Sequence, residues 1–236
     1  MLYDRSGRGN HGTLTNMAPA SDWVTAKVRN TPGRVLDFDG TDDRVSAPNS
    51  GSLNPTSAIS LASWFRVTST PTGVQQAIAR KGWILGANSQ YSIRTIGDKL
   101  SGFCVNSSGT IGVATGATSL AANRWYLGVC TYDGTNVRAY LDGSIDATTA
   151  LNGPLAVFSE PLQVGAAFDT NFNSPTLFLT GQIAELAIWN RAITPSEIRT
   201  LYRIGPGWFG KRDSRFRGYA EQAAAFNRRR RILTAG

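Results

Sequence analysis

The chain has little of what metal centres and nucleophilic enzymes are usually built from, with one histidine and two cysteines in 236 residues. His11 stands alone in a glycine-rich stretch, which leaves no partner for a Ser–His–Asp triad or a histidine-based metal centre. Cys104 and Cys130 are too few for a disulfide framework. We expect two buried thiols, with a single disulfide as the alternative if their strands are neighbours.

Long apolar runs and charged residues are also scarce. No run approaches the roughly 18 apolar residues of a membrane span, and no basic segment followed by an apolar stretch opens the chain. No secretory signal is therefore visible, and we expect folding in a cytoplasm. Charged residues make up 17% of the chain, whereas apolar residues make up 41% and glycines number 25. Such a composition predicts a turn-rich body with a sizeable core.

The body has the pattern of an antiparallel β-sandwich. Short alternating or apolar runs recur between Gly, Asn, Asp and Pro, which is typical of a sandwich or jelly roll rather than of βαβ units. The expected strands are 34–38, 44–47, 59–67, 75–81, 91–96, 99–105, 111–115, 124–132, 137–141, 145–149, 162–164 and 181–189. The clearest segment is 123–149, where two Asp-Gly turns separate three strands of a meander.

One helix is predicted to close the body. Thr194 and Glu197 have the spacing of a capping box, with proline at the first helical position. Apolar residues at helical spacing follow from Ile198, so we expect the helix to pack on the edge of the sandwich and to end near Ile204. The Gly-Pro-Gly sequence at 205–207 then breaks the chain.

The end of the chain carries nearly all of its charge. Residues 203–236 hold nine Lys/Arg against two acids, a net +7 out of +8 for the whole chain. We therefore predict two parts, a body (1–204) and a basic arm (205–236), with residues 219–231 becoming helical when the arm docks. The expected anchors to a partner are Trp208, Phe209, Lys211, Arg212, Arg215, Arg217, Tyr219, Phe226, Arg228, Arg229, Arg230 and Arg231.

Five segments, in order, resemble the laminin-G-like, concanavalin A-like jelly-roll domains. They are DRSGRGNHGT at 4–13, LDFDGTDDRV at 36–45, Trp64-Phe65, the hairpin at 123–143 and the closing strand at 181–192. The resemblance covers about residues 3–203 and implies an all-β fold of two antiparallel sheets packed face to face. Members are often binding modules for glycans or proteins, many carry one calcium ion, and they occur in secreted enzymes, adhesins and virion proteins.

A calcium site is the metal chemistry that the residues allow. Asp39, Asp42 and Asp43 lie within five residues in a predicted turn, and carboxylate oxygens suit a hard cation. Glu185 stands in an otherwise apolar run and needs a partner, either a cation or an arginine. The alternative for the three aspartates is a solvated turn. Members of the family often have aspartate at the position of Ala184, and its replacement by alanine here counts against a calcium site.

Nothing in the sequence predicts catalysis. Paired carboxylates at alternate strand positions would be needed for glycoside hydrolysis, and no Glu-x-Asp-x-Glu occurs. Asp37 and Asp39 have the spacing, but Asp39 leads into a turn. We therefore expect a non-enzyme. Four aromatic residues could contact a glycan, although alternation places most aromatics in the core, and none is assigned to a glycan site: Trp23, Trp83, Tyr91 and Trp189.

Three functions remain open. The first is a structural or interaction protein of a phage or virus, a capsid decoration or fibre protein that displays the body on a virion surface and docks through its arm, as an oligomer within the assembly. The second is a carbohydrate-binding, lectin-like module. The third is a nucleic-acid-associated protein that uses the arginine run at 228–231, although no recognised nucleic-acid-binding motif accompanies it.

Overall fold

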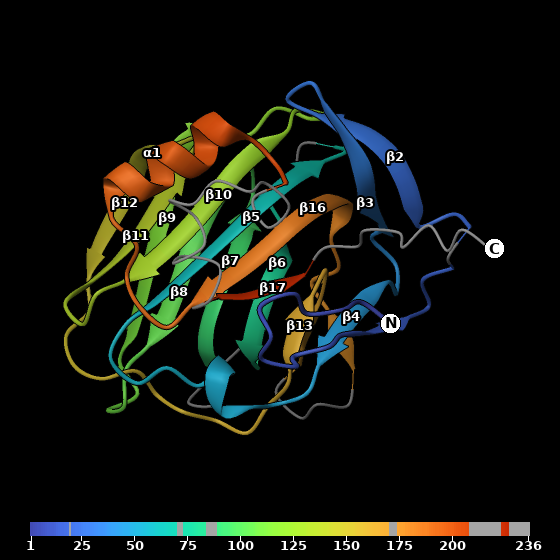
Figure 1. Cartoon of the computed structure of the whole chain (residues 1–236). Helices are drawn as coiled ribbons and strands as arrows, with labels where there is room; N and C mark the ends of the chain where they lie inside the picture. Colours follow the sequence, from blue (N-terminus) through green and yellow to red (C-terminus); the bar gives the residue numbers. More distant parts are fainter. Residues whose placement is uncertain (19, 70–72, 84–88, 170–173, 208–222, 227–236) are drawn as a thin grey trace.

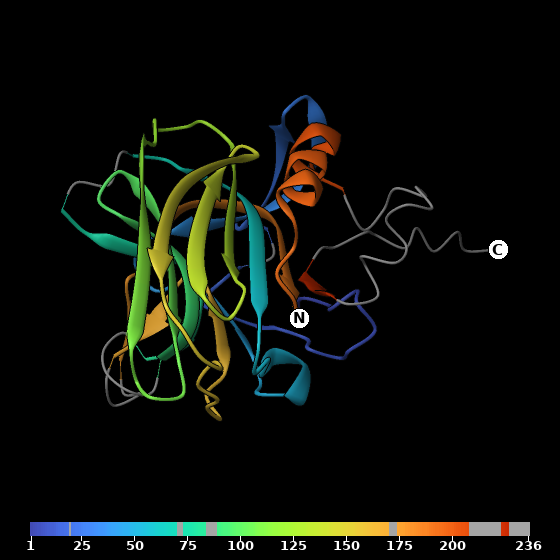
Figure 2. The ribbon, with the colours of Figure 1, turned by 90° about the vertical axis from the view of Figure 1, so that its left-hand side faces the viewer.

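Two antiparallel sheets pack face to face in the computed structural model, which confirms the predicted jelly-roll sandwich. The structure describes all residues except 19, 70–72, 84–88, 170–173, 208–222 and 227–236, and it describes the backbone alone for 223–226. Figure 1 shows one sheet in front with a helix lying on it, and Figure 2 shows the second sheet on the far side of the sandwich from that helix. No helix among these residues is long and apolar enough to cross a membrane.

The seven-stranded sheet has the order β1-β4-β13-β6-β7-β8-β9. Its strands are β1 (Thr13–Thr15), β4 (Arg44–Ala47), β13 (Leu162–Val164), β6 (Gln75–Gly82), β7 (Ser89–Ile96), β8 (Lys99–Val105) and β9 (Ile111–Ser119). All of the expected strands in this sheet form, and β1 is an addition. We expected no strand there because Thr13–Thr15 is too short to alternate visibly.

The eight-stranded sheet runs β12-β11-β10-β5-β16-β3-β2, with β17 beside β16. Its strands are β2 (Trp23–Val28), β3 (Thr31–Asp39), β5 (Ile59–Val67), β10 (Tyr126–Tyr132), β11 (Asn136–Leu141), β12 (Ser144–Ala150), β16 (Thr180–Trp189) and β17 (Ala223–Phe226). The meander is confirmed as β10, β11 and β12. Two small elements lie outside both sheets. One is a short 3₁₀ helix, η1 (Gly51–Leu53), and the other is a two-stranded sheet formed by β14 (Ala167–Phe168) and β15 (Pro175–Thr176).

The core fills the space between the two sheets. Large side chains such as Phe65, Tyr91 and Tyr126 are buried there, as the period-two alternation of their strands requires. Cys104 and Cys130 lie in the same cluster, buried and free. They are the two buried thiols that the sequence predicted.

The helix α1 (Pro195–Ile204) begins at the predicted capping box. Thr194 Oγ1 accepts a hydrogen bond from the Glu197 amide (3.3 Å), and the Glu197 carboxylate accepts one from the Thr194 amide (2.6 Å). The helix lies on the outer face of the eight-stranded sheet, where Ile198 and Leu201 join a buried cluster with Trp64. The expectation that it packs on an edge is confirmed in part, because α1 contacts the edge strand β12 and also buries Ile198 and Leu201 on the apolar outer face of β5 and β10.

The structure describes the arm at residues 205–207 and 223–226, and the second of these segments is a strand. The predicted helix 219–231 includes Ala223–Phe226, which instead forms β17, antiparallel to Leu186–Trp189 of β16. β3 pairs with β16 only as far as Ile183, so the backbone of β16 beyond it is an open edge. A strand forms hydrogen bonds with the unpaired backbone N–H and C=O groups of that edge. A short isolated helix is only marginally stable and would leave those groups unpaired.

Candidate functional site

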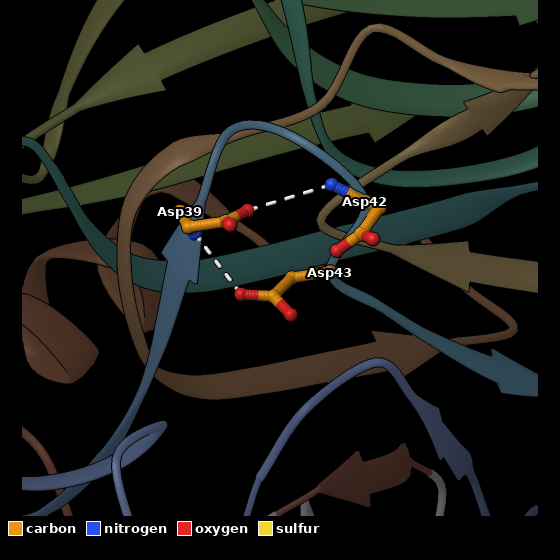
Figure 3. Close-up of side chains that lie close together, drawn as sticks. All are labelled: Asp39, Asp42 and Asp43. Atoms are coloured by element: carbon orange, nitrogen blue, oxygen red, sulfur yellow. Dashed lines mark hydrogen bonds between the residues drawn. The ribbon is translucent and has the colours of Figure 1, made fainter.

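Three aspartates converge in the turn between β3 and β4, as the sequence predicted (Figure 3). Ligand oxygens of Asp39, Asp42 and Asp43 all lie within 4.8 Å of one another. Backbone amides orient two of the side chains, because the Asp39 carboxylate accepts a hydrogen bond from the Thr41 amide (2.7 Å) and the Asp43 carboxylate accepts one from the Asp39 amide (3.1 Å). The arrangement offers carboxylate oxygens of the kind that a hard cation such as Ca²⁺ takes.

Asp43 is the strained member of this turn. Its side chain is buried, and burial together with the charges of Asp39, Asp22 and Asp42 raises its pKa to about 6, although the bond from the Asp39 amide acts in the opposite direction. A bound cation would lower the pKa of Asp43, because its attraction for the three carboxylates would outweigh their mutual repulsion.

Glu185 does not belong to this group. Thr180 of β16 pairs with Asp39, and Glu185 stands five residues further along the strand, about 16 Å away. Its buried carboxylate accepts a hydrogen bond from the Gly207 amide (2.8 Å), where the chain leaves α1. One partner of Glu185 is therefore a backbone amide, and the candidate metal ligands reduce to the three aspartates.

A second cluster lies on the outer face of the seven-stranded sheet. Strand pairing places one residue of each strand in a lateral row, with Gln163 (β13) opposite Arg80 (β6), Arg80 opposite Ser92 (β7) and Ser92 opposite Phe103 (β8). Neighbours of these residues along the strands, such as Leu162 and Tyr91, point into the core. The row therefore points outward, away from the sandwich and from α1 (Figure 2). We call these four residues and Arg94 the outer polar row.

The outer polar row is buried although it faces outward. Arg80, Ser92 and Gln163 are at most 1% exposed, and Phe103 and Arg94 are 5% and 6% exposed. Phe103 packs in a small cluster with Val105, Val113, Ala156 and Phe158. Exposure increases toward β9, where Val113 is half-buried and Thr115 is exposed.

Several polar atoms of the row have unfilled hydrogen-bonding capacity. Arg80 donates through Nε to the Trp83 carbonyl (2.7 Å) and through Nη2 to Ser89 Oγ (2.7 Å), and Gln163 donates to Ser46 Oγ (2.8 Å). Four buried atoms nevertheless have no hydrogen-bond partner among the described residues: Arg80 Nη1, Ser92 Oγ, Arg94 Nε and Gln163 Oε1. Buried polar groups in proteins are nearly always satisfied, so such a concentration is typical of a site that a ligand completes.

The predicted aromatic candidates fall mostly in the core. Trp23 and Tyr91 belong to the inter-sheet core, and Trp189 belongs to the cluster under α1, whereas Trp83 is half-buried. Sequence reasoning missed the outer polar row. Alternation of Ser92 and Arg94 with Ile93 puts both polar residues on one face of β7, but only the strand register joins them to Arg80 and Gln163.

Most of the proposed anchors lie outside the described residues. These are Trp208, Phe209, Lys211, Arg212, Arg215, Arg217, Tyr219 and Arg228–Arg231. Phe226 is in β17, where its backbone pairs with Leu186.

Residues 39–199, more than half of the chain, match the family model of laminin-G type described as the concanavalin A-like lectin/glucanases superfamily, and the chain belongs to this family. Similar solved structures include the binding domain of Paraclostridial mosquitocidal protein 1, at 14% identity with a TM-score of 0.61, covering 82% of this chain and 48% of that one. The receptor-binding domain of botulinum neurotoxin mosaic serotype C/D has 12% identity, a TM-score of 0.64 and coverage of 86% and 48%. The ligand-binding domain of botulinum neurotoxin serotype D, solved with N-acetylneuraminic acid, has 11% identity, a TM-score of 0.61 and coverage of 86% and 48%.

These likenesses show the fold that the sequence predicted. The chain spans about half the length of each of these solved chains. No curated protein matches the chain.

Proposed function

We propose that this member of the concanavalin A-like superfamily is a non-catalytic, lectin-like module that binds a glycan on the outer face of its seven-stranded sheet. The observation that carries the proposal is the outer polar row, with its unfilled hydrogen-bonding atoms beside Phe103. No strand or helix of the eight-stranded side lies over this face.

A saccharide has the chemistry that this face needs. Its hydroxyl groups both donate and accept, so they can satisfy Gln163 Oε1 and Ser92 Oγ together. Its C–H faces can pack against an apolar ring such as Phe103 while polar groups around it fix orientation. The likeness to binding domains, one of them solved with a saccharide, supports the same class of ligand.

A glycan array with matched variants tests the proposal. Ser92→Ala and Gln163→Ala each remove one polar group of the row, and Ser144→Ala on the exposed edge strand β12 is the control. We expect the wild type and the control to bind one sugar class with equal affinity. Each row variant should lose about threefold to tenfold in affinity, the usual effect of one neutral hydrogen bond. Equal binding by all four proteins would place the glycan elsewhere.

The charge distribution favours a second role, attachment of the body to a large assembly. Residues 203–236 hold nine basic and two acidic residues, which suits an acidic or extended partner surface. We propose that this arm fastens the body to a capsid, so that several copies display their glycan-binding faces on a virion or similar particle. The rival is attachment to nucleic acid through the arginine run at 228–231, which predicts a steep loss of affinity with salt.

We also propose one structural Ca²⁺ at the β3–β4 turn. The convergence of three carboxylates and the raised pKa of Asp43 support it, because a cation removes the repulsion that both features create.

A further inference from the structure

Two arginines of the outer polar row share one aromatic ring. The guanidinium carbon of Arg80 lies 4.8 Å from the centre of the Phe103 ring, and that of Arg94 lies 5.0 Å from it. The two cations are therefore no more than about 10 Å apart, and they are near enough for the charge of Arg94 to act on Arg80. Neither belongs to an ion pair with another described residue, although four other basic residues do.

Two buried cations without a counter-ion are costly. Burial lowers the pKa of Arg80 to about 9, with the neighbouring charge of Arg94 acting in the same direction, and burial likewise lowers the pKa of Arg94. A guanidinium group stays protonated in proteins at neutral pH, so both side chains carry a positive charge. Buried charges in proteins are normally paired or hydrogen-bonded, yet in the described part of the chain Arg80 Nη1 and Arg94 Nε have no partner.

We infer that the ligand of the outer polar row is an anionic saccharide, whose carboxylate or sulfate group is held by Arg80 and Arg94. This inference rests on the proposed glycan-binding function and names the class of glycan. Guanidinium groups present N–H donors in a planar fork that matches a carboxylate or sulfate.

The neighbours of the arginines favour a saccharide over a free anion. An inorganic ion would satisfy the two cations but would leave Ser92 Oγ and Gln163 Oε1 without partners. Arg80 aligns with Gln163 on one side and with Ser92 on the other. A sugar ring that extends from the anionic group along this row would reach both, and it would enter from the side of β9, where Thr115 is exposed.

Titration of the full chain with paired saccharides tests the inference. Glucuronic acid and N-acetylneuraminic acid are compared with glucose and N-acetylglucosamine, and with sodium sulfate, at an ionic strength held constant with sodium chloride. The variants are Arg80→Gln, Arg94→Gln and Arg94→Lys, with Arg124→Gln as the control. Arg124 is an exposed arginine that pairs with Asp142 and lies over the Tyr126 ring of the other sheet.

We expect an acidic sugar to bind at least tenfold more tightly than its neutral counterpart. Both glutamine variants should lose roughly tenfold to hundredfold in affinity, Arg94→Lys should lose less, and the control should lose nothing. In the absence of sugar, the glutamine variants should melt at or above the wild-type temperature, because each removes an unpaired buried charge. A variant that keeps a cooperative melting transition is folded, so its loss of affinity cannot be explained by unfolding.

Three results would overturn the inference. The first is equal affinity for acidic and neutral sugars, with binding lost in Ser92→Ala but kept in Arg94→Gln. This result would show a site for neutral glycans, so the proposed function would stand without the inference. Saturation by sulfate with no added affinity from any sugar would identify a free-anion site. Absence of binding by every probe would reject both the inference and the proposed function.

Discussion

At the scale of single residues, the β3–β4 turn depends on a glycine and on a buried acid. Gly40 has φ +82°, and a Cβ there would lie 2.0 Å from Thr180 Oγ1. Asp43 is 5% exposed beside two other carboxylates. Gly40 allows the turn that brings the three carboxylates together. Asp43 is the carboxylate whose ionisation this arrangement makes unfavourable.

Replacement of Gly40 by alanine should destabilise the body by more than about 1 kcal/mol, because the new side chain meets both an unfavourable φ and Thr180. Chemical denaturation measures the change. Gly33→Ala is the control, since a Cβ there has open space and an ordinary φ. Equal effects of the two substitutions would show that the geometry of the turn is not what matters.

Asp43→Asn should stabilise the calcium-free protein at pH 8, by on the order of 1 kcal/mol. The folded-state pKa of Asp43 is about 6, above its ordinary value of 3.8, so the folded state binds the proton more tightly. The resulting penalty is full above pH 6 and disappears below pH 3.8. Thermal melting in EDTA from pH 3.5 to pH 8 should therefore show the two proteins converging at low pH.

Calcium should reverse the order of these two proteins. At pH 8, added Ca²⁺ should raise the melting temperature of the wild type well above that of Asp43→Asn, which lacks one charged ligand. An equal rise in both proteins would reject the proposed ion at Asp39, Asp42 and Asp43.

At the scale of elements, the helix α1 was predictable from its own residues, whereas β17 was not. The capping box at Thr194 and Glu197 is a local signal, and it set the start of the helix correctly. Ala223–Phe226 carries no strand signal, and its structure is decided by the open edge of β16. The outer polar row escaped prediction for the same reason, because its members meet only through strand register.

Loss of the cap should cost the helix measurable stability. Thr194→Ala should destabilise the protein by about 1 kcal/mol, and Arg199→Gln, an exposed substitution within the helix, should have little effect. Urea denaturation followed by circular dichroism compares them. If Thr194→Ala lowers the free energy of unfolding no more than Arg199→Gln does, the hydrogen bond that Thr194 accepts from the Glu197 amide contributes nothing to stability.

Glu197→Gln should destabilise the protein in a pH-dependent way. Partial burial acts to raise the pKa of Glu197, but hydrogen bonds from Arg191 and from the Thr194 amide hold it below the ordinary 4.5. A depressed pKa stabilises the fold above pH 4.5, and the effect fades as the pH falls through the folded-state pKa. The destabilisation should therefore be seen at pH 7 and be much smaller at pH 2.5. A constant difference would contradict the ion pair with Arg191.

At the scale of the whole molecule, the sandwich has its own core and the arm adds one edge strand to it. As far as the structure describes side chains, the buried clusters between the sheets and under α1 are formed by residues before 205. The fold class was predictable because turn residues and period-two alternation repeat along the whole body. The proposed glycan site was not predictable from composition or motif, because it combines side chains from four strands of one sheet.

Truncation after Gly207 tests the division into body and arm, and keeps the bond from Gly207 to Glu185. The body should remain folded and monomeric, with faster amide exchange along the β16 edge at Leu186–Trp189, where β17 is lost. Glycan binding should be unchanged, whereas incorporation into the assembly should fail. A truncated chain that unfolds, or one that still incorporates fully, would contradict the division.

The most direct test of the glycan-binding face is nuclear magnetic resonance of the full chain titrated with glucuronic acid. The predicted result is that the guanidinium Nε–Hε signals of Arg80 and Arg94 and the amide signals around Ser92 and Phe103 shift together and saturate with one affinity. Shifts confined to α1 and β16, on the opposite side of the sandwich (Figure 2), would contradict the account.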